Sequence, residues 1–196
     1  MKKIISVAFC VISTLCVIVF ATFGEYSEIS NYDIVSGIAI DLQDDKWTVT
    51  CEICVPSSDN DFASSVTYVT GTGYTLDNAF SNAALKSANE LYTDSTGLYL
   101  ISDTAKGNNC LYEYLKGDTV NLRAVAVWTE CPAKDIFKSD DSENERAKSL
   151  AIAKKIKTYC RKNNAKTPGI IELLKDSDYV FVSEQKTPER TGLRDE

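Results

Sequence analysis

The chain has no histidine among its 196 residues. This absence excludes the Ser-His-Asp and Cys-His arrangements of hydrolases and most zinc sites. Its most glycine-rich stretch, Gly71-Thr72-Gly73, is also not followed directly by a lysine. A phosphate-binding P-loop requires that lysine, so we interpret the stretch as a turn before a helix.

Positive charge is scarce. The chain carries 21 basic and 28 acidic residues, a net charge of −7, and two of the lysines lie at its very start, as Lys2 and Lys3. A net acidic protein repels the phosphate backbone, so nucleic acid is not expected as a partner. The part beyond these lysines has 19 basic and 28 acidic residues, a net charge of −9, and we expect it not to bind anionic lipid.

The N-terminus differs from the rest of the chain. Lys2 and Lys3 are followed by twenty uncharged residues, 4–23, which is typical of a secretory signal or an N-terminal membrane anchor. The two lysines favour export of the chain beyond the segment. Whether the segment is cleaved, after Ala21 or Gly24, or retained stays open. Lipidation is less favoured, because Phe9 and Leu15 precede the cysteines of this segment.

Seven cysteines are present, two of them (Cys10 and Cys16) in the apolar segment. The other five are Cys51, Cys54, Cys110, Cys131 and Cys160. An odd number cannot pair completely within one chain. We expect mostly buried thiols, with one disulfide possible.

Residues 33–56, "DIVSGIAIDLQDDKWTVTCEICVP", predict an antiparallel β-hairpin. Apolar residues alternate with polar ones in both halves, and a short polar connector, 43–45, joins them. In the first half we place Ile34, Ser36, Ile38, Ile40 and Leu42 on one face and Val35, Gly37, Ala39 and Asp41 on the other.

The remaining chain predicts alternating strands and helices. Strands are expected over 66–73, 97–103, 121–130 and near 179–183. Helices are expected over 74–92, with Thr75 as N-cap, over 109–117, around 136–137, over 138–160 and in a last turn before the final strand. In the long helix the apolar stripe is Ile152, Ile156, Tyr159 and Cys160. The predicted fold class is α/β (α+β), a mixed sheet that starts with the hairpin and has helices packed on it.

Several groups resemble chemical sites but have simpler interpretations. "CEIC", Cys51 to Cys54, lies on a predicted strand, so its thiols face opposite sides, whereas redox pairs sit at a helix N-terminus. Asp59-Asn60-Asp61 lacks the glycine and distal glutamate of a calcium loop. Helix-start charges explain Asp140, Asp141, Glu143 and Glu145, and core packing explains Trp47 and Trp128. We therefore predict no catalytic, cofactor-binding or metal-binding residues, and no enzyme activity.

The ordered segments "ISNYDIVSGIAIDLQDDKWTVTCEICVP", "GTGYTLDNAFSNAALKSANELY", "LYLISDTA" and "NLRAVAVWTECPAKDIF" carry a family resemblance. Together they resemble the N-terminal domain of the Ger(x)C family of spore germination proteins, the C subunits of nutrient germinant receptors. The likeness covers residues 29–138 and extends more faintly to 184. It implies no catalytic or ligand-binding residues, because the family is not known as an enzyme family.

The resemblance implies a membrane-associated, extracytoplasmic protein that contacts other germinant receptor subunits, at the spore inner membrane, or a secreted one if the signal is cleaved. We expect a signal or anchor over 1–24 that meets the membrane through residues 4–23, one stand-alone domain over 25–184, and a polar tail over 185–196. Two alternatives stay open: an exported binding module unrelated to germination, and a small exported hydrolase.

Overall fold

The computed structural model describes residues 12–14, 31–55, 65–138, 147–175 and 180–181. The chain divides into two units, Met1–Asn31 and Tyr32–Glu196. In the first unit residues 12–14 are helical, and most of the predicted membrane segment over 4–23 lies outside the described residues. Within the described ranges, none of the helices is long and apolar enough to cross a bilayer.

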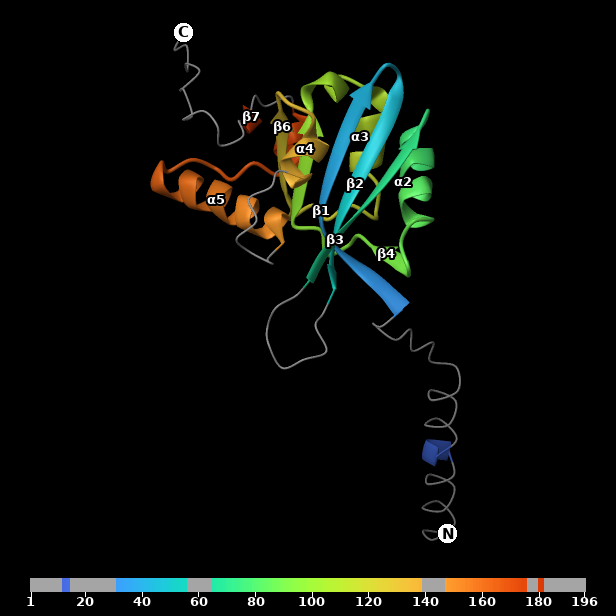
Figure 1. Ribbon diagram of the computed structural model, residues 1–196. Coiled ribbons are helices and arrows are strands. Elements are labelled where there is room, and N and C mark those ends of the chain that lie inside the picture. Colours follow the sequence, from blue (N-terminus) through green and yellow to red (C-terminus); the bar gives the residue numbers. More distant parts are fainter. Residues whose placement is uncertain (1–11, 15–30, 56–64, 139–146, 176–179, 182–196) are drawn as a thin grey trace, which may run out of the picture. The chain divides into compact units, whose positions relative to one another are not determined.

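The second unit is built on one seven-stranded mixed sheet (Figure 1), which confirms the predicted fold class. Its strand order is β3-β2-β1-β5-β6-β7, and β4 pairs with the start of β1. β2 pairs antiparallel with both β1 and β3. The other pairs, β1–β4, β1–β5, β5–β6 and β6–β7, are parallel. The strands are β1 (Tyr32–Gln43), β2 (Lys46–Val55), β3 (Ser65–Gly73), β4 (Glu90–Tyr92), β5 (Leu98–Ser102), β6 (Val125–Thr129) and β7 (Val180–Phe181).

The predicted hairpin is formed by β1 and β2. Its turn residues, Asp44 and Asp45, have φ values of 49° and 57°, the left-handed conformation that a two-residue hairpin turn requires. One part of the face assignment is wrong, because the register shifts between Val35 and Gly37 and leaves Ser36 as a bulge. Val35 and Ile38 therefore lie on the same face of the sheet, whereas they were predicted on opposite faces.

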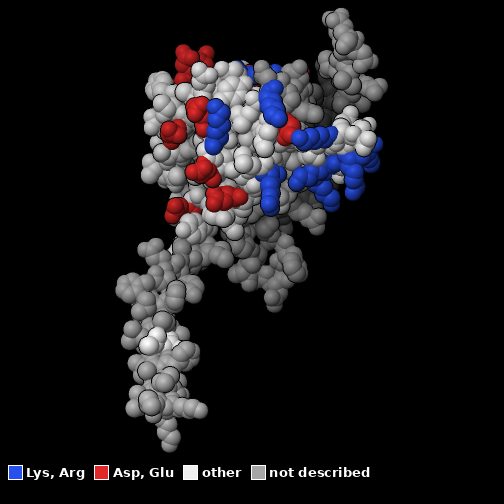
Figure 2. All heavy atoms as spheres, turned by 180° about the vertical axis from the view of Figure 1, so that it is seen from behind, with Lys and Arg blue, Asp and Glu red and all other residues white. Residues whose placement is uncertain are grey.

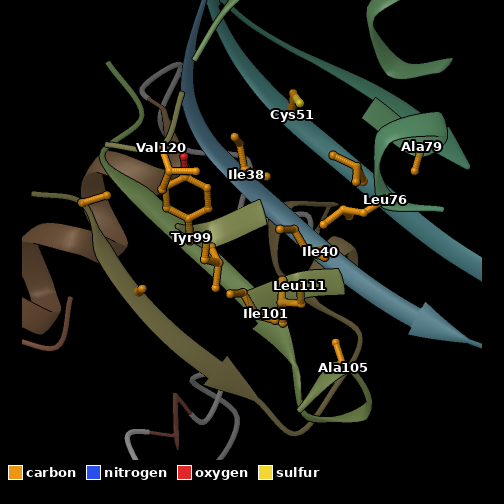
Figure 3. Close-up of a cluster of buried hydrophobic side chains, with 14 of the residues drawn as sticks. Ile38, Ile40, Cys51, Leu76, Ala79, Tyr99, Ile101, Ala105, Leu111 and Val120 are labelled. Carbon is orange, nitrogen blue, oxygen red and sulfur yellow. The ribbon is translucent and has the colours of Figure 1, made fainter. Parts of the chain in front are cut away.

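Helices cover both faces of the sheet. On what we call the first face lie α2 (Leu76–Ala84), α3 (Asn109–Leu115) and α6 (Ile170–Leu174), packed over the larger apolar cluster. Figure 3 shows this cluster, with Ile38 and Ile40 of β1 beside Tyr99 and Ile101 of β5. On the second face lie α4 (Ala133–Lys138) and α5 (Lys148–Lys162), packed over Leu98, Leu100, Val125 and Val127. A short 3-10 turn, η2 (Asp103–Ala105), follows β5.

Helix α2 begins as predicted, since the Thr75 side chain accepts the N–H of Asn78 at 3.2 Å. Its end differs from the prediction. The helix stops at Ala84 instead of reaching residue 92, because the next residues bind β1. Ser87 and Asn89 donate hydrogen bonds to the Asp33 carboxyl group, and the chain then forms β4 beside β1.

Two details of the later elements also correct the sequence analysis. In α5 the buried residues are Ser149, Ala153, Ile156 and Cys160, whereas Tyr159 is 57% exposed. Strand β6 begins at Val125, four residues later than predicted, and all of its residues are buried.

Candidate functional site: helix α5 and the carboxyl groups of the second face

The residues that the sequence analysis weighed as chemical sites do not come together. Cys51 is buried in the cluster of the first face, where burial raises the pKa of its thiol to about 12. Cys54 is only partly buried, and its thiol is free, as are those of Cys51, Cys110 and Cys160. Because of its raised pKa, the Cys51 thiol stays protonated and is a poor nucleophile. The structure thus indicates that Cys51 of "CEIC" contributes to core packing and does not act as a redox thiol.

Of the other candidates, some lie among the described residues and some lie outside them. Trp47 and Trp128 lie in the apolar core, as predicted. Gly71 and Gly73 end β3 instead of forming a turn. Asp59 to Asp61, together with Asp140, Asp141, Glu143 and Glu145, lie outside the described residues. Among the residues that are described, no three Cys, Asp or Glu side chains are grouped as metal ligands.

A buried carboxyl group that the sequence analysis did not single out lies on the second face. Glu52 of β2 is fully buried, yet its two oxygens accept hydrogen bonds from three residues. The Ser36 hydroxyl donates to Oε1 at 2.7 Å, and the Tyr68 hydroxyl donates to Oε2 at 3.2 Å. Ser149 of α5 donates both its hydroxyl and its N–H, the latter at 3.1 and 3.2 Å. Four donor groups fill the acceptor sites of the carboxyl group.

This arrangement provides a helix cap from a distant part of the chain. Ala147 occupies the N-cap position of α5 and offers no capping side chain. Glu52, 97 residues earlier, accepts the Ser149 N–H instead and places negative charge at the positive end of the helix dipole. Burial, together with the nearby Glu52 charge, raises the pKa of Tyr68, so its hydroxyl remains a donor.

Two local features of β1 make room for the cap. The bulge at Ser36 turns that hydroxyl toward Glu52 on the second face. At Gly37 a side chain would collide with α5 and α4, because a Cβ there would lie closer than 3.0 Å to Ser149 and Phe137. Gly37 therefore allows the start of α5 to lie directly on the sheet.

Helix α4 is held in the same way. Asp41, near the end of β1, accepts the N–H groups of Ala133 at 2.6 Å and Lys134 at 3.0 Å. Burial raises the pKa of Asp41, and these two hydrogen bonds offset that rise only in part. Both buried carboxyl groups of the second face thus bind helix N-termini. Such saturated groups suit structural support better than proton transfer to a substrate.

The surface of α5 differs in charge from its buried side. The helix contains no acidic residue and six basic ones: Lys148, Lys154, Lys155, Lys157, Arg161 and Lys162. Figure 2 shows most of the visible Lys and Arg side chains over the side of the molecule where α5 lies, and most of the visible Asp and Glu side chains on the other side of this view. Although the chain has a net negative charge, the exposed surface of α5 is locally positive.

Charge segregation of this kind was not predicted, although the run "KSLAIAKKIKTYCRK" was visible. The acids at 140–145 and the lysines behind them predict a longer helix, 138–160, in which both sets of charges complement the helix dipole. In the structure α5 begins only at Lys148, so acids of the predicted first turns are not part of it.

Comparison with known proteins assigns a family. The family described as "Spore germination protein N-terminal domain" matches residues 25–178. No curated protein and no solved structure matches the chain. The match spans every described strand and helix of the second unit except β7.

Proposed function

The chain belongs to the family of spore germination protein N-terminal domains and has a germination-related role, and on that premise we propose that it acts without catalysis, as a membrane-held extracytoplasmic subunit. It would contact other components of a nutrient germinant receptor. The uncharged segment 4–23 after Lys2 and Lys3 supports the membrane attachment.

One observation supports contact over catalysis. The two carboxyl groups buried on the second face, Glu52 and Asp41, are occupied by N–H and hydroxyl donors of the fold itself. A general acid or base must instead be within hydrogen-bonding reach of a substrate. Attachment to a membrane raises the effective concentration of the domain near its partners, so weak contacts are sufficient for assembly.

The test is performed in sporulating cells with the full chain carrying a C-terminal tag. We expect the chain in the spore membrane fraction, co-purifying with integral-membrane germination subunits, and a slower nutrient response in spores that lack it. A matched strain carries the same chain with residues 4–23 replaced by an efficiently cleaved signal, which should release the protein and weaken complementation. Recovery of the full chain only from soluble fractions, without germination subunits, would contradict the proposal, as would substrate turnover lost on a single substitution.

A further inference from the structure

We propose that the exposed face of α5 is a docking surface for anionic phospholipid. We call this surface the α5 basic face and define it by Lys154, Lys157, Arg161 and Lys162. This inference rests on the proposed function for its setting, because it assumes that a membrane is near. It adds which side of the domain faces that membrane.

The first argument is the pattern of charge along the helix. Leu150, Lys154, Lys157 and Arg161 recur at intervals of three and four residues and form one exposed stripe. Lys155, Tyr159 and Lys162 form a second stripe at the same spacing. Ala151, which is also exposed, lies between the two stripes. Positive charge therefore covers most of the outward surface of a helix about 22 Å long.

The second argument is that this charge is not neutralised by the fold. Among the described residues, no carboxyl group forms an ion pair with any member of the α5 basic face. Each of these four side chains is exposed. Unpaired cations that lie close together repel one another, and a nearby anionic surface reduces this repulsion. Near such a surface each Lys or Arg strengthens binding by roughly fivefold.

The third argument distinguishes lipid from a protein partner. Each stripe carries one large exposed apolar side chain, Leu150 at 56% and Tyr159 at 57% exposure. The continuous apolar side of α5 packs on the sheet, so the helix offers a membrane its basic stripes and these two side chains, and a cluster of basic residues attracts anionic headgroups. Three of the four defining residues are lysines, whose mobile point charges suit a fluid array of headgroups better than one fixed carboxylate geometry.

The charge distribution of the domain also predicts orientation. The chain as a whole is acidic, so an anionic membrane repels most of its surface. In Figure 2 most of the visible basic side chains lie on the α5 side, and most of the visible acidic ones lie on the other side of the view. Attraction on one side and repulsion on the other turn the α5 basic face toward the lipid. The opposite, acidic side then remains available to the receptor partners.

The experiment uses the full chain reconstituted with vesicles that contain either phosphatidylglycerol or only phosphatidylcholine. A photo-crosslinking amino acid replaces Ala151, between the two stripes, or Leu85 at the end of α2 on the other face of the sheet. Flotation with the vesicles measures membrane attachment, and crosslinked lipid measures the contact of each position. We expect crosslinking from position 151 to exceed that from position 85 more than tenfold, with phosphatidylglycerol only, and to fall at high salt.

Matched variants separate this surface from net charge. In the first, glutamine replaces Lys154, Lys157, Arg161 and Lys162, which should reduce lipid crosslinking from position 151 more than tenfold. In the second, glutamine replaces four exposed basic residues elsewhere: Lys46, Lys116, Arg123 and Lys175. It has the same net charge and should crosslink as the parent does. Circular dichroism of each variant reports whether the fold is retained.

The possible outcomes distinguish the two proposals. Flotation with both lipids but no lipid crosslinking from position 151 overturns the inference and leaves the proposed anchoring intact. Flotation with phosphatidylglycerol alone, lost in the α5 variant, supports the inference and contradicts the anchor. Crosslinking from position 151 to a second copy of the chain identifies protein as the occupant and overturns the inference, as does equal crosslinking in both lipids.

Discussion

Helices cover both faces of the sheet, but the two faces hold them differently. On the first face α2 is held by close backbone approach, with Ala79 and Ala83 packed against the glycines of β3. On the second face α4 and α5 are held at their first residues by Asp41 and Glu52. Apolar packing tolerates small shifts, whereas a hydrogen-bonded helix terminus defines where the helix begins. The helix that carries the exposed basic charge is thus held in the more specific way.

The largest effect should come from removing the cap of α5. We expect Glu52→Ala to lower the free energy of unfolding by about 3 kcal/mol or more, because it leaves a cavity and several buried donors without an acceptor. Glu52→Gln retains the volume and one acceptor oxygen, so its loss should be smaller. Urea unfolding of the three proteins measures both differences. A loss below about 1 kcal/mol for Glu52→Ala would mean that α5 does not depend on this cap.

The next largest effect should come from the glycines of the first face. A Cβ on Gly71 would lie closer than 3.0 Å to backbone atoms of α2, so Gly71→Ala should displace the helix and cost about 1–3 kcal/mol. Gly97→Ala is the matched control, because its nearest neighbour would be Ser36 O at an ordinary 3.7 Å. Thermal unfolding should separate the two substitutions. Equal melting temperatures would show that α2 is not held by close approach.

These two attachments also differ in how far the sequence reveals them. The attachment of α2 is local, because its alanines recur at helical spacing and the glycines that they approach precede them by only a few residues. The attachments of α4 and α5 join residues 92 and 97 positions apart. In β2, Glu52 alternates with the apolar residues Trp47, Val49 and Cys51, and no local pattern in the sequence indicates a helix packed over its side of the strand.

The predicted end of α2 and the predicted faces of β1 were wrong for a related reason. Helical periodicity continues past Ala84, but Asp33 binds Ser87 and Asn89 and diverts the chain into β4. The bulge at Ser36 likewise depends on the partner of its hydroxyl, Glu52. In each case a tertiary hydrogen bond overrides a local preference. The basic residues of α5 can be read from the sequence, but the residue at which the helix begins cannot.

A smaller effect is expected at the cap of α4. Asp41→Ala removes the acceptor of two N–H groups at the start of a short helix, which should cost about 1–2 kcal/mol. Asp41→Asn retains one acceptor oxygen and removes the buried charge, so its cost should be lower than that of alanine. Urea unfolding measures both. If asparagine and alanine cost the same, the Asp41 oxygens do not contribute as a cap.

The smallest effect is a dependence on pH, and it distinguishes the partly buried carboxyl group of Asp33 from the buried one of Asp41. Burial tends to raise the pKa of Asp33, but hydrogen bonds from Ser87 and Asn89 outweigh it and lower the pKa below the usual 3.8. Its contribution to stability is therefore fully present above the unfolded pKa and is lost as the pH falls through the folded pKa. The pKa of Asp41 is raised by burial, so its ionised form opposes folding and protonation on acidification relieves that cost.

Melting temperatures measured between pH 7 and pH 3 should therefore change in opposite directions for the two asparagine variants. The advantage of the parent over Asp33→Asn should shrink as the pH falls below 3.8, because the parent loses the ionised acceptor that binds Ser87 and Asn89. Relative to Asp41→Asn, the parent should instead gain as the pH falls toward 3.8 and Asp41 binds a proton in the folded state. Parallel curves for both pairs would mean that hydrogen bonding and burial do not set these two pKa values in opposite directions, and that the carboxyl groups at the edge and on the second face are held alike.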